Sequence, residues 1–275
     1  MHIVTTIAGS DSGGGAGIQA DLKTFQELGV FGTSVITALT AQNTLGVMDV
    51  LPIDQDFVNK QIHVLLDDFP ISAIKTGMLF SSAIIQATAK ALSTFAIPLI
   101  VDPVMIAKGG ENLLQQEAIE ALKNDLLPLA TIVTPNIPEA ETLTGIKIHN
   151  VSDIRHAAQL LLQLGVQCVI IKGGHLANKD FAVDYVFFNN GQSFSMQSTR
   201  IETKNTHGTG CTFSAALTAF IGQKMPIEQA IIEAKKFIQL AITYDLSIGN
   251  GHGPTNHFAY QKFKDTCEVT IDETK

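Results

Sequence analysis

The chain has 275 residues, 45% apolar and 16% charged, so it can bury a sizeable core, and we expect one domain over residues 1–275 with a polar tail from about residue 263. The net charge of −8 and the lack of a basic run exclude a nucleic-acid surface, which needs clustered Lys and Arg. No apolar stretch approaches the roughly 18 residues of a membrane span, and the N-terminus has no signal-peptide pattern. These features favour a cytoplasmic protein with small-molecule partners.

Apolar strand-like runs alternate with helical patterns along the chain. Strands are expected, in this order, in the runs HIVTTIA, TSVITALTA, AIKTGM, PLIVDPV, TIVTPN and CVIIKGG. Helices are expected near residues 18–28, 56–68, 82–95, 115–124, 139, 154–164, 209–222 and 227–248. Residues 181–198 contain two further runs around Asn-Asn-Gly, which predicts a hairpin. Because the other strands are apolar throughout, we predict an α/β fold with a mostly parallel sheet covered by helices on both faces.

A glycine-rich loop, SDSGGGAGIQAD, follows the first strand. Within it Gly15 to Ala20 satisfies the dinucleotide fingerprint G-x-G-x-x-G/A, which would suit a nicotinamide-dependent oxidoreductase. That fingerprint also needs an acidic residue about 20 positions later to hold a ribose, and residues 31–43 contain no Asp or Glu. The sequence therefore argues against this class of enzyme.

Polar and glycine-rich residues follow nearly every expected strand. Ligands of open α/β sheets bind at the carboxyl ends of the strands, so these residues predict one binding rim. The densest cluster is TKNTHGTGCT, residues 203–212, which leads directly into a helix. Unpaired backbone N–H groups and the helix dipole favour an anion at such a helix start.

Seven segments carry a resemblance to a known family. In chain order they are GSDSGGGAGIQADLKTF, TALTAQNT, KTGML, VDPVM, TPNIPEAE, IKGGH and TKNTHGTGCTFSAAL. Over about residues 3–257 the chain resembles the hydroxymethylpyrimidine and phosphomethylpyrimidine kinases of thiamine biosynthesis, in the ribokinase superfamily. The resemblance implies an αβα sandwich that uses ATP and Mg²⁺. It also implies transfer of the γ-phosphoryl group to 4-amino-5-hydroxymethyl-2-methylpyrimidine, then to its monophosphate, and an enzyme that forms a homodimer.

Cys211 is the candidate catalytic base. Three cysteines, Cys168, Cys211 and Cys267, leave one unpaired and lack metal-ligand spacing, so each is considered singly. A thiol at a helix N-terminus can fall below its usual pKa of about 8.5 and accept a proton as thiolate. The alternative is a small core residue. The resemblance favours catalysis by Cys211, with the backbone of Gly208, Thr209 and Gly210 around the transferred phosphoryl group.

The resemblance assigns the first glycine-rich loop to the acceptor pocket. Gln42 ends an apolar strand, and its amide can both donate and accept a hydrogen bond, which suits an aminopyrimidine edge. The remaining pocket residues implied by the resemblance are Gly9, Ala16, Asp21, Met78 and Met105. For Asp21 the alternative interpretation is a surface acid in the first turn of its helix.

On the nucleotide side, Asn136 and Glu139 form the Asn-x-x-Glu pattern that lies near magnesium and phosphates in the superfamily. They also fit a helix capping box, and both roles are compatible. Asp102 and Glu139 would hold Mg²⁺ partly through water, since this ion takes few carboxylates. Lys172 and Lys204 are the expected cations beside the nucleotide, whereas His207 and His175 are expected to be local structural groups.

Pyridoxal kinase of the same subgroup is the alternative function. Its cysteine-bearing members carry a second cysteine in the loop after VDPVM, where this chain has Ala107. The absence of that cysteine favours the pyrimidine kinases.

Overall fold

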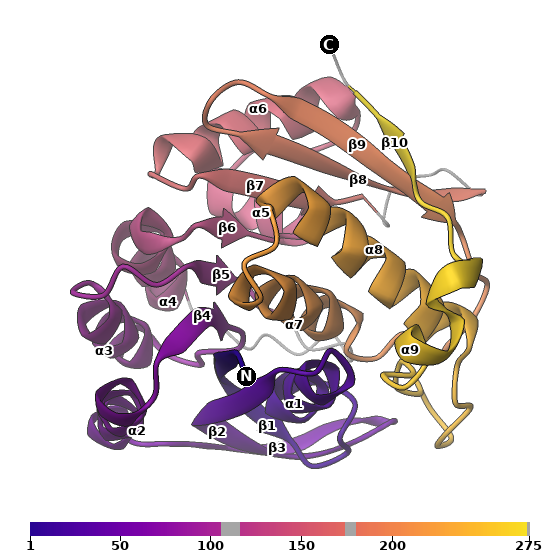
Figure 1. The fold of residues 1–275 in the computed structure, drawn as a ribbon. Helices are drawn as coiled ribbons and strands as arrows, with labels where there is room; N and C mark the ends of the chain where they lie inside the picture. Colours follow the sequence, from indigo (N-terminus) through magenta and orange to yellow (C-terminus); the bar gives the residue numbers. More distant parts are fainter. Residues whose placement is uncertain (106–115, 174–179, 274–275) are drawn as a thin grey trace.

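The structure is a computed structural model that describes residues 1–105, 116–173 and 180–273. Its strands form one mixed sheet, and its helices pack against that sheet (Figure 1). Over this part of the chain ten strands run in the order β10-β9-β8-β7-β6-β5-β4-β1-β2-β3. Strands β2, β1, β4, β5, β6 and β7 pair in parallel, and the pairs at both ends of the sheet are antiparallel. The strands are β1 (Ile3–Asp11), β2 (Phe31–Asn43), β3 (Gly46–Pro52), β4 (Ile71–Thr76), β5 (Leu99–Val101), β6 (Ile132–Val133), β7 (Cys168–Lys172), β8 (Phe181–Phe188), β9 (Ser193–Thr199) and β10 (Thr270–Asp272).

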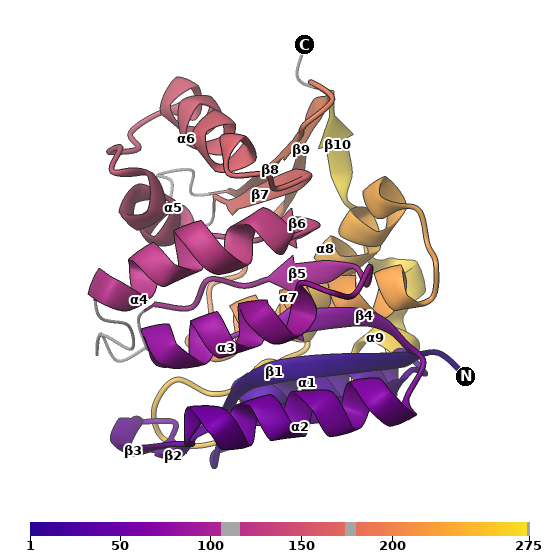
Figure 2. The same ribbon diagram turned by 90° about the vertical axis from the view of Figure 1, so that its left-hand side faces the viewer.

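Helices cover both faces of the sheet, so the predicted αβα sandwich is confirmed (Figures 1 and 2). One layer holds α1 (Gly17–Glu27), α7 (Thr209–Gly222), α8 (Ile227–Thr243) and α9 (Tyr260–Phe263). The other holds α2 (Gln55–Asp68), α3 (Ser82–Leu92), α4 (Gln116–Ala121), α5 (Ile137–Thr144) and α6 (Val151–Gln163). Each layer buries its own apolar cluster against the sheet, one around Phe25 and Phe237 and the other around Ile85 and Leu161. This double cover explains why the central strands are apolar throughout.

Most expected elements lie where the sequence pattern placed them. The hairpin over residues 181–198 is confirmed as β8 and β9, and the helix expected over 209–222 is α7. The helix expected near 115–124 begins outside the described residues and continues as α4 and a π-helical turn, Leu122–Leu126. A 3₁₀ turn, Leu127–Leu129, leads from there to β6. None of the helices in the described ranges is long and apolar enough to cross a membrane.

At three places the structure differs from the expected elements. The helix expected over 227–248 ends at Thr243, because the Asp245 carboxylate accepts hydrogen bonds from Thr203 and Asn205, both at 2.8 Å, and Ser247 has a left-handed φ of 48°. The polar tail from about residue 263 continues as a 3₁₀ turn, Lys264–Thr266, and the edge strand β10. Strand β3 was not expected. Both missed strands are largely exposed edge strands, and β10 has only three residues, so apolar periodicity does not reveal them.

Candidate active site

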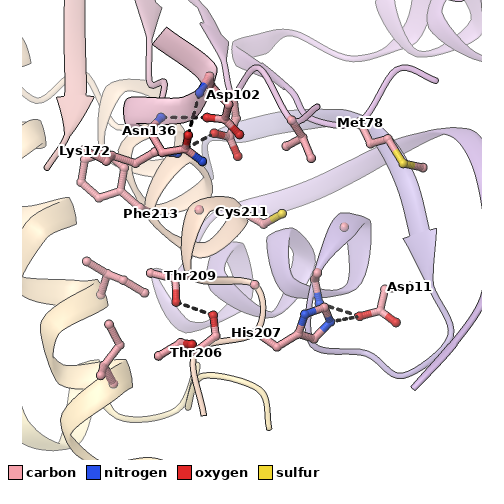
Figure 3. Close-up of a pocket in the computed structure, with 18 of the residues that line it drawn as sticks. Asp11, Met78, Asp102, Asn136, Lys172, Thr206, His207, Thr209, Cys211 and Phe213 are labelled. Carbon is pink, nitrogen blue, oxygen red and sulfur yellow. Dashed lines mark hydrogen bonds and ion pairs between the residues drawn. The ribbon is translucent and has the colours of Figure 1, made fainter. Parts of the chain in front are cut away.

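A cavity of about 830 Å³ opens at the carboxyl ends of the parallel strands. Residues at or just after β1, β2, β4, β5, β6 and β7 line it, together with the start of α7, so the binding rim predicted from the strand ends is confirmed. Figure 3 shows the Cys211 side chain between two polar groups, the Asp102–Lys172 pair and the Asp11–His207 pair. The pocket therefore has two chemically different ends on either side of the α7 N-terminus. We name them by the sequence prediction: the Asp102–Lys172 end is the nucleotide-side end, and the Asp11–His207 end is the acceptor end.

The start of α7 depends on a glycine. Gly208 is its N-cap with a left-handed φ of 78°, and within the described residues no side chain caps the helix. A Cβ on Gly208 would overlap the carbonyl oxygen of Gly15, so the two glycine-rich loops touch through their backbones at this point. Gly208, Thr209 and Gly210 at this helix start line the cavity, and a helix start without a side-chain cap is the arrangement that binds anions.

Cys211 lies in the first turn of α7 and lines the cavity. The expected low thiol pKa is wrong, because burial raises the pKa of Cys211 to about 12. The Lys75 ammonium and the backbone N–H of Gly17 oppose this rise, whereas the carboxylates of Asp21 and Asp102 add to it. Burial is therefore the dominant influence on the pKa of this thiol. The role of Cys211 as proton acceptor stays a prediction.

A buried ion pair interacts with Cys211 electrostatically. Lys75 and Asp21 are both fully buried, 2.9 Å apart, and Thr6 donates a further hydrogen bond to the Asp21 carboxylate at 2.6 Å. Burial opposes the charge on Lys75, but Asp21, and to a smaller degree Cys211, raise the pKa of this lysine. The alternative interpretation of Asp21 as a surface acid is wrong. Neither Asp21 nor Lys75 lines the cavity, so the pair acts on the site through its charges, which influence the pKa of Cys211 in opposite directions.

Asp102 and Lys172 form the charged centre of the nucleotide-side end. Their ion pair is 3.0 Å long, and Thr134 and Ser214 also donate hydrogen bonds to the Asp102 carboxylate. Burial opposes ionisation of Asp102, but Lys172 and Lys75 hold its pKa below the usual range. In the same way Asp102 and Glu139 raise the pKa of Lys172 against the effect of burial. The pair is therefore ionised and fixed in position.

Asn136 and Glu139 form the expected capping box at the start of α5. The Asn136 side chain accepts from the Glu139 N–H, and the Glu139 carboxylate accepts from the Asn136 N–H, both at 2.8 Å. Burial raises the pKa of Glu139 to about 7; Lys172 opposes the rise and the nearby Asp102 carboxylate adds to it. Both residues line the cavity, so the structural role coexists with a position beside the nucleotide-side end.

The acidic side chains here suit a magnesium ion only if it is held mainly by water and phosphate. Within the described ranges no group of three or more His, Cys, Asp or Glu side chains is arranged to hold a metal. Asp102 and Glu139 are two carboxylates that repel each other, and a cation would relieve this repulsion. Mg²⁺ usually takes one or two carboxylates and keeps several waters, so this pair fits such an ion.

The acceptor end contains a polar group in which the sequence predicted Gln42 as a substrate residue and His207 as a local structural group, but missed Asp11. His207 Nε2 lies 2.8 Å from Asp11 Oδ2, and the Gln42 amide lies 3.3 Å from the same nitrogen. Asp11 also accepts the backbone N–H groups of Gly13, Gly15 and Ala16, which fixes the first glycine-rich loop. The sequence of the first glycine-rich loop does not reveal the role of Asp11, because its partner His207 lies 196 positions away in the chain.

A second buried pair, also missed, lies at the far nucleotide-side end of the cavity. Lys235 on α8 donates to Asp184 on β8 at 2.7 Å, and Asp184 accepts the backbone N–H of Gly173. Both side chains line the cavity beside the apolar Ile238 and Ile242. The hairpin β8–β9 thus contributes a wall of the pocket, a role that no sequence motif indicated.

The structure brings most of the predicted site residues together. Met105 is not among them, because its side chain is buried in the apolar core. Lys204 is exposed on the loop before α7 and does not line the cavity. His175 and Ala107 lie outside the described residues. The predicted residues that line the cavity are Gly9, Ala16, Gln42, Met78, Asp102, Asn136, Glu139, Lys172, Gly208, Thr209, Gly210 and Cys211.

The αβα sandwich, with the glycine-capped N-terminus of α7 beside the carboxyl ends of the strands, defines the class of ribokinase-like small-molecule kinases. The model of the phosphomethylpyrimidine kinase family matches residues 11–256. The chain belongs to this family.

Individual relatives agree with this assignment. A hydroxymethylpyrimidine/phosphomethylpyrimidine kinase of Haemophilus influenzae is 54% identical over 94% of this chain and 97% of its own length. The structure of a phosphomethylpyrimidine kinase from Clostridium difficile 630 is 45% identical, with a TM-score of 0.77, and covers 88% of this chain and 100% of its own. The pyridoxal kinase of Staphylococcus aureus in complex with AMP-PCP and pyridoxal is 36% identical, with a TM-score of 0.89, over 100% of both chains.

Proposed function

We propose that this chain transfers the γ-phosphoryl group of ATP to the hydroxymethyl oxygen of 4-amino-5-hydroxymethyl-2-methylpyrimidine. It then phosphorylates the resulting monophosphate, in thiamine biosynthesis. The observation that carries the proposal is membership of the phosphomethylpyrimidine kinase family, with high identity to a relative named for both steps. The use of ATP is supported by the AMP-PCP bound to a structurally similar kinase.

Phosphoryl transfer relies on positioning and on neutralisation of charge, and the pocket offers both. The acceptor would lie against the first glycine-rich loop, with its hydroxyl near Cys211. Cys211 would first lose its own proton to solvent, a step that burial opposes and Lys75 favours. The thiolate would then accept the hydroxyl proton as the oxygen bonds to the γ-phosphorus and the bond to the β-phosphate oxygen breaks. The backbone N–H groups at Gly208, Thr209 and Gly210 would stabilise the charge on the transferred group.

Asp102 and Glu139 are the residues that would hold Mg²⁺, in part through water. The ion would neutralise charge on the ATP phosphates. Lys172 would contribute a fixed positive charge at the same end of the cavity, since its ion pair with Asp102 holds it there.

A coupled assay of ADP formation tests the proposal. The purified enzyme is given ATP with the hydroxymethylpyrimidine, its monophosphate or pyridoxal, each over a range of concentrations. We expect the highest kcat/KM values for the two pyrimidines. If neither pyrimidine supports ADP formation, the proposed function is wrong, whatever the result with pyridoxal.

Pyridoxal kinase is the second candidate, because the S. aureus pyridoxal kinase superposes on the whole chain with the higher TM-score. The higher sequence identity of the pyrimidine kinases favours the first candidate. The same assay separates them by the ratio of the two kcat/KM values. The homodimer and the cytoplasmic location remain predictions of the resemblance, and sedimentation velocity would test the first.

A further inference from the structure

The Asp11–His207–Gln42 group has a hydrogen-bonding constraint that the proposed reaction does not use. Asp11 is 3% exposed, and four N–H groups surround its carboxylate: those of Gly13, Gly15 and Ala16 and the ring of His207. Burial opposes ionisation of Asp11, but the His207 hydrogen bond and these backbone bonds lower its pKa. Asp11 is therefore an ionised acceptor at neutral pH, and an atom 2.8 Å from it must donate.

That requirement fixes the proton on His207. Its Nε2 must carry hydrogen, because a bare nitrogen lone pair would repel the Asp11 carboxylate at 2.8 Å. The ring cannot move away. The backbone N–H and C=O of His207 bond to Gly253 and Thr255, and the ring packs so tightly on Gly15 that a Cβ there would meet it. The protonated Nε2 has no lone pair left to accept a bond from Gln42.

The orientation of the Gln42 amide follows from this. As drawn, Gln42 Nε2 faces His207 Nε2 at 3.3 Å, so two donors meet. The other amide atom lies 3.1 Å from Thr40 Oγ1, whose one hydrogen can go either to this atom or, over the shorter distance of 2.9 Å, to the carbonyl oxygen of Ser10. Exchanging the oxygen and nitrogen of the amide, which have the same shape, removes this donor–donor contact. The Nε2 hydrogen, which goes mainly to Asp11 at 2.8 Å, is then shared with the Gln42 oxygen at 3.3 Å. The carbonyl oxygen then faces His207, and the NH₂ group donates to Thr40.

We propose that His207, held by Asp11, is a positioning residue that fixes which way round Gln42 presents its amide to the substrate. Together with Thr40 it leaves one N–H and one oxygen lone pair of Gln42 for the ligand in the cavity. This inference rests on the proposed function. An aminopyrimidine edge carries a donor next to an acceptor, so an amide turned the wrong way would oppose both bonds. The trio thereby selects aminopyrimidines over rings with another polar edge, such as pyridoxal.

The proton position can be tested without any assay of activity. Histidine labelled with ¹⁵N is incorporated into the full chain, and long-range ¹H–¹⁵N correlations report which ring nitrogens carry hydrogen. The His207 signals are assigned by their loss in His207→Gln. We expect a protonated Nε2 at neutral pH. A bare Nε2, with hydrogen only on Nδ1, would overturn the proposal.

Kinetics of two His207 variants test the selection itself. His207→Gln keeps an N–H donor at the end of the side chain, and His207→Leu removes it, so only the second should let the Gln42 amide turn. We expect His207→Leu to raise KM for the hydroxymethylpyrimidine and to lower its kcat/KM relative to pyridoxal about 10–100-fold, the usual effect of unpaired buried polar groups. The kcat and the KM for ATP should stay within a few-fold of wild type, and His207→Gln should recover most of the ratio.

Three further arms keep this test decisive. His156→Leu, on the exposed surface of α6, is the matched control for the loss of a histidine and should leave the ratio unchanged. If His207→Leu does not fold, Thr40→Val, which keeps the side-chain shape but removes the second anchor of the amide, should shift the ratio in the same direction. An unchanged ratio in every folded variant would refute the role of His207. A wild-type enzyme inactive on pyrimidines would refute the proposed function, while the nitrogen correlations would still test the amide orientation.

Discussion

At the residue level the proposed chemistry depends on Cys211, whose thiol is harder to ionise than a helix start alone would make it. We expect Cys211→Ala to lower turnover by about 10²–10⁴, the range for loss of a positioned base. Alanine keeps α7 and its N–H groups, so the dissociation constants for ATP and the pyrimidine should change little. Steady-state rates, calorimetric binding and thermal midpoints measure these three effects separately. Turnover within a few-fold of wild type would show that Cys211 is a packing residue and not the catalytic base.

Glu139 makes the stability of the protein depend on pH. Its folded-state pKa of about 7 lies above the ordinary value of 4.5, so the native state binds more protons than the unfolded state between these values. The stability from protonated Glu139 is fully present below pH 4.5 and is lost as the pH rises through 7. Glu139→Gln cannot ionise but keeps the capping shape. Without Mg²⁺, we expect the variant to gain stability relative to wild type between pH 5 and pH 8, measured by urea unfolding. A constant difference between the two proteins would contradict the raised pKa.

Among the elements, α7 depends most on one backbone position. Gly208 and Gly145 have nearly the same left-handed φ, 78° and 74°, but only Gly208 faces another backbone, that of Gly15, at the position of a Cβ. Gly145→Ala should therefore show only the loss due to strain, about 1 kcal/mol. Gly208→Ala must also separate the two glycine-rich loops, so we expect a larger loss of stability and a loss of turnover. Urea unfolding and kcat of both variants provide the comparison, and equal effects would argue against close loop contact as the reason for this glycine.

The two capping boxes separate a structural role from a functional one. Asn136 caps α5 beside the cavity and Asn150 caps α6 away from it, each with an acidic partner three residues later. Asn136→Ala and Asn150→Ala should each lower the free energy of unfolding by about 1 kcal/mol. Only Asn136→Ala should also raise KM for ATP, because only that side chain borders the nucleotide-side end. If both variants kept the wild-type KM, Asn136 would be a cap alone.

For the whole molecule, ligand binding should raise global stability, since the cavity is lined by residues from β1 to α8. A ligand that binds only the native state at 100 times its Kd adds about 2.7 kcal/mol to the free energy of unfolding. We expect AMP-PCP and the hydroxymethylpyrimidine each to raise the thermal midpoint in a concentration-dependent manner. AMP-PCP should still do so in Cys211→Ala. A midpoint that does not respond to either ligand would argue against this cavity as the binding site.

The sequence alone determined the elements whose signals are local. Apolar runs separated by helical patterns predicted the parallel centre of the sheet, Asn-Asn-Gly predicted the hairpin, and HGTGC predicted the start of α7, because periodicity, turn residues and glycine act over a few neighbouring positions. The tertiary structure decided what depends on distant neighbours. It paired Lys75 with Asp21 across 54 positions and His207 with Asp11 across 196, and it placed Met105 in the core instead of the pocket. It also decided the pKa of Cys211, since desolvation and charge are set by all the elements that surround a group and by no motif within the chain.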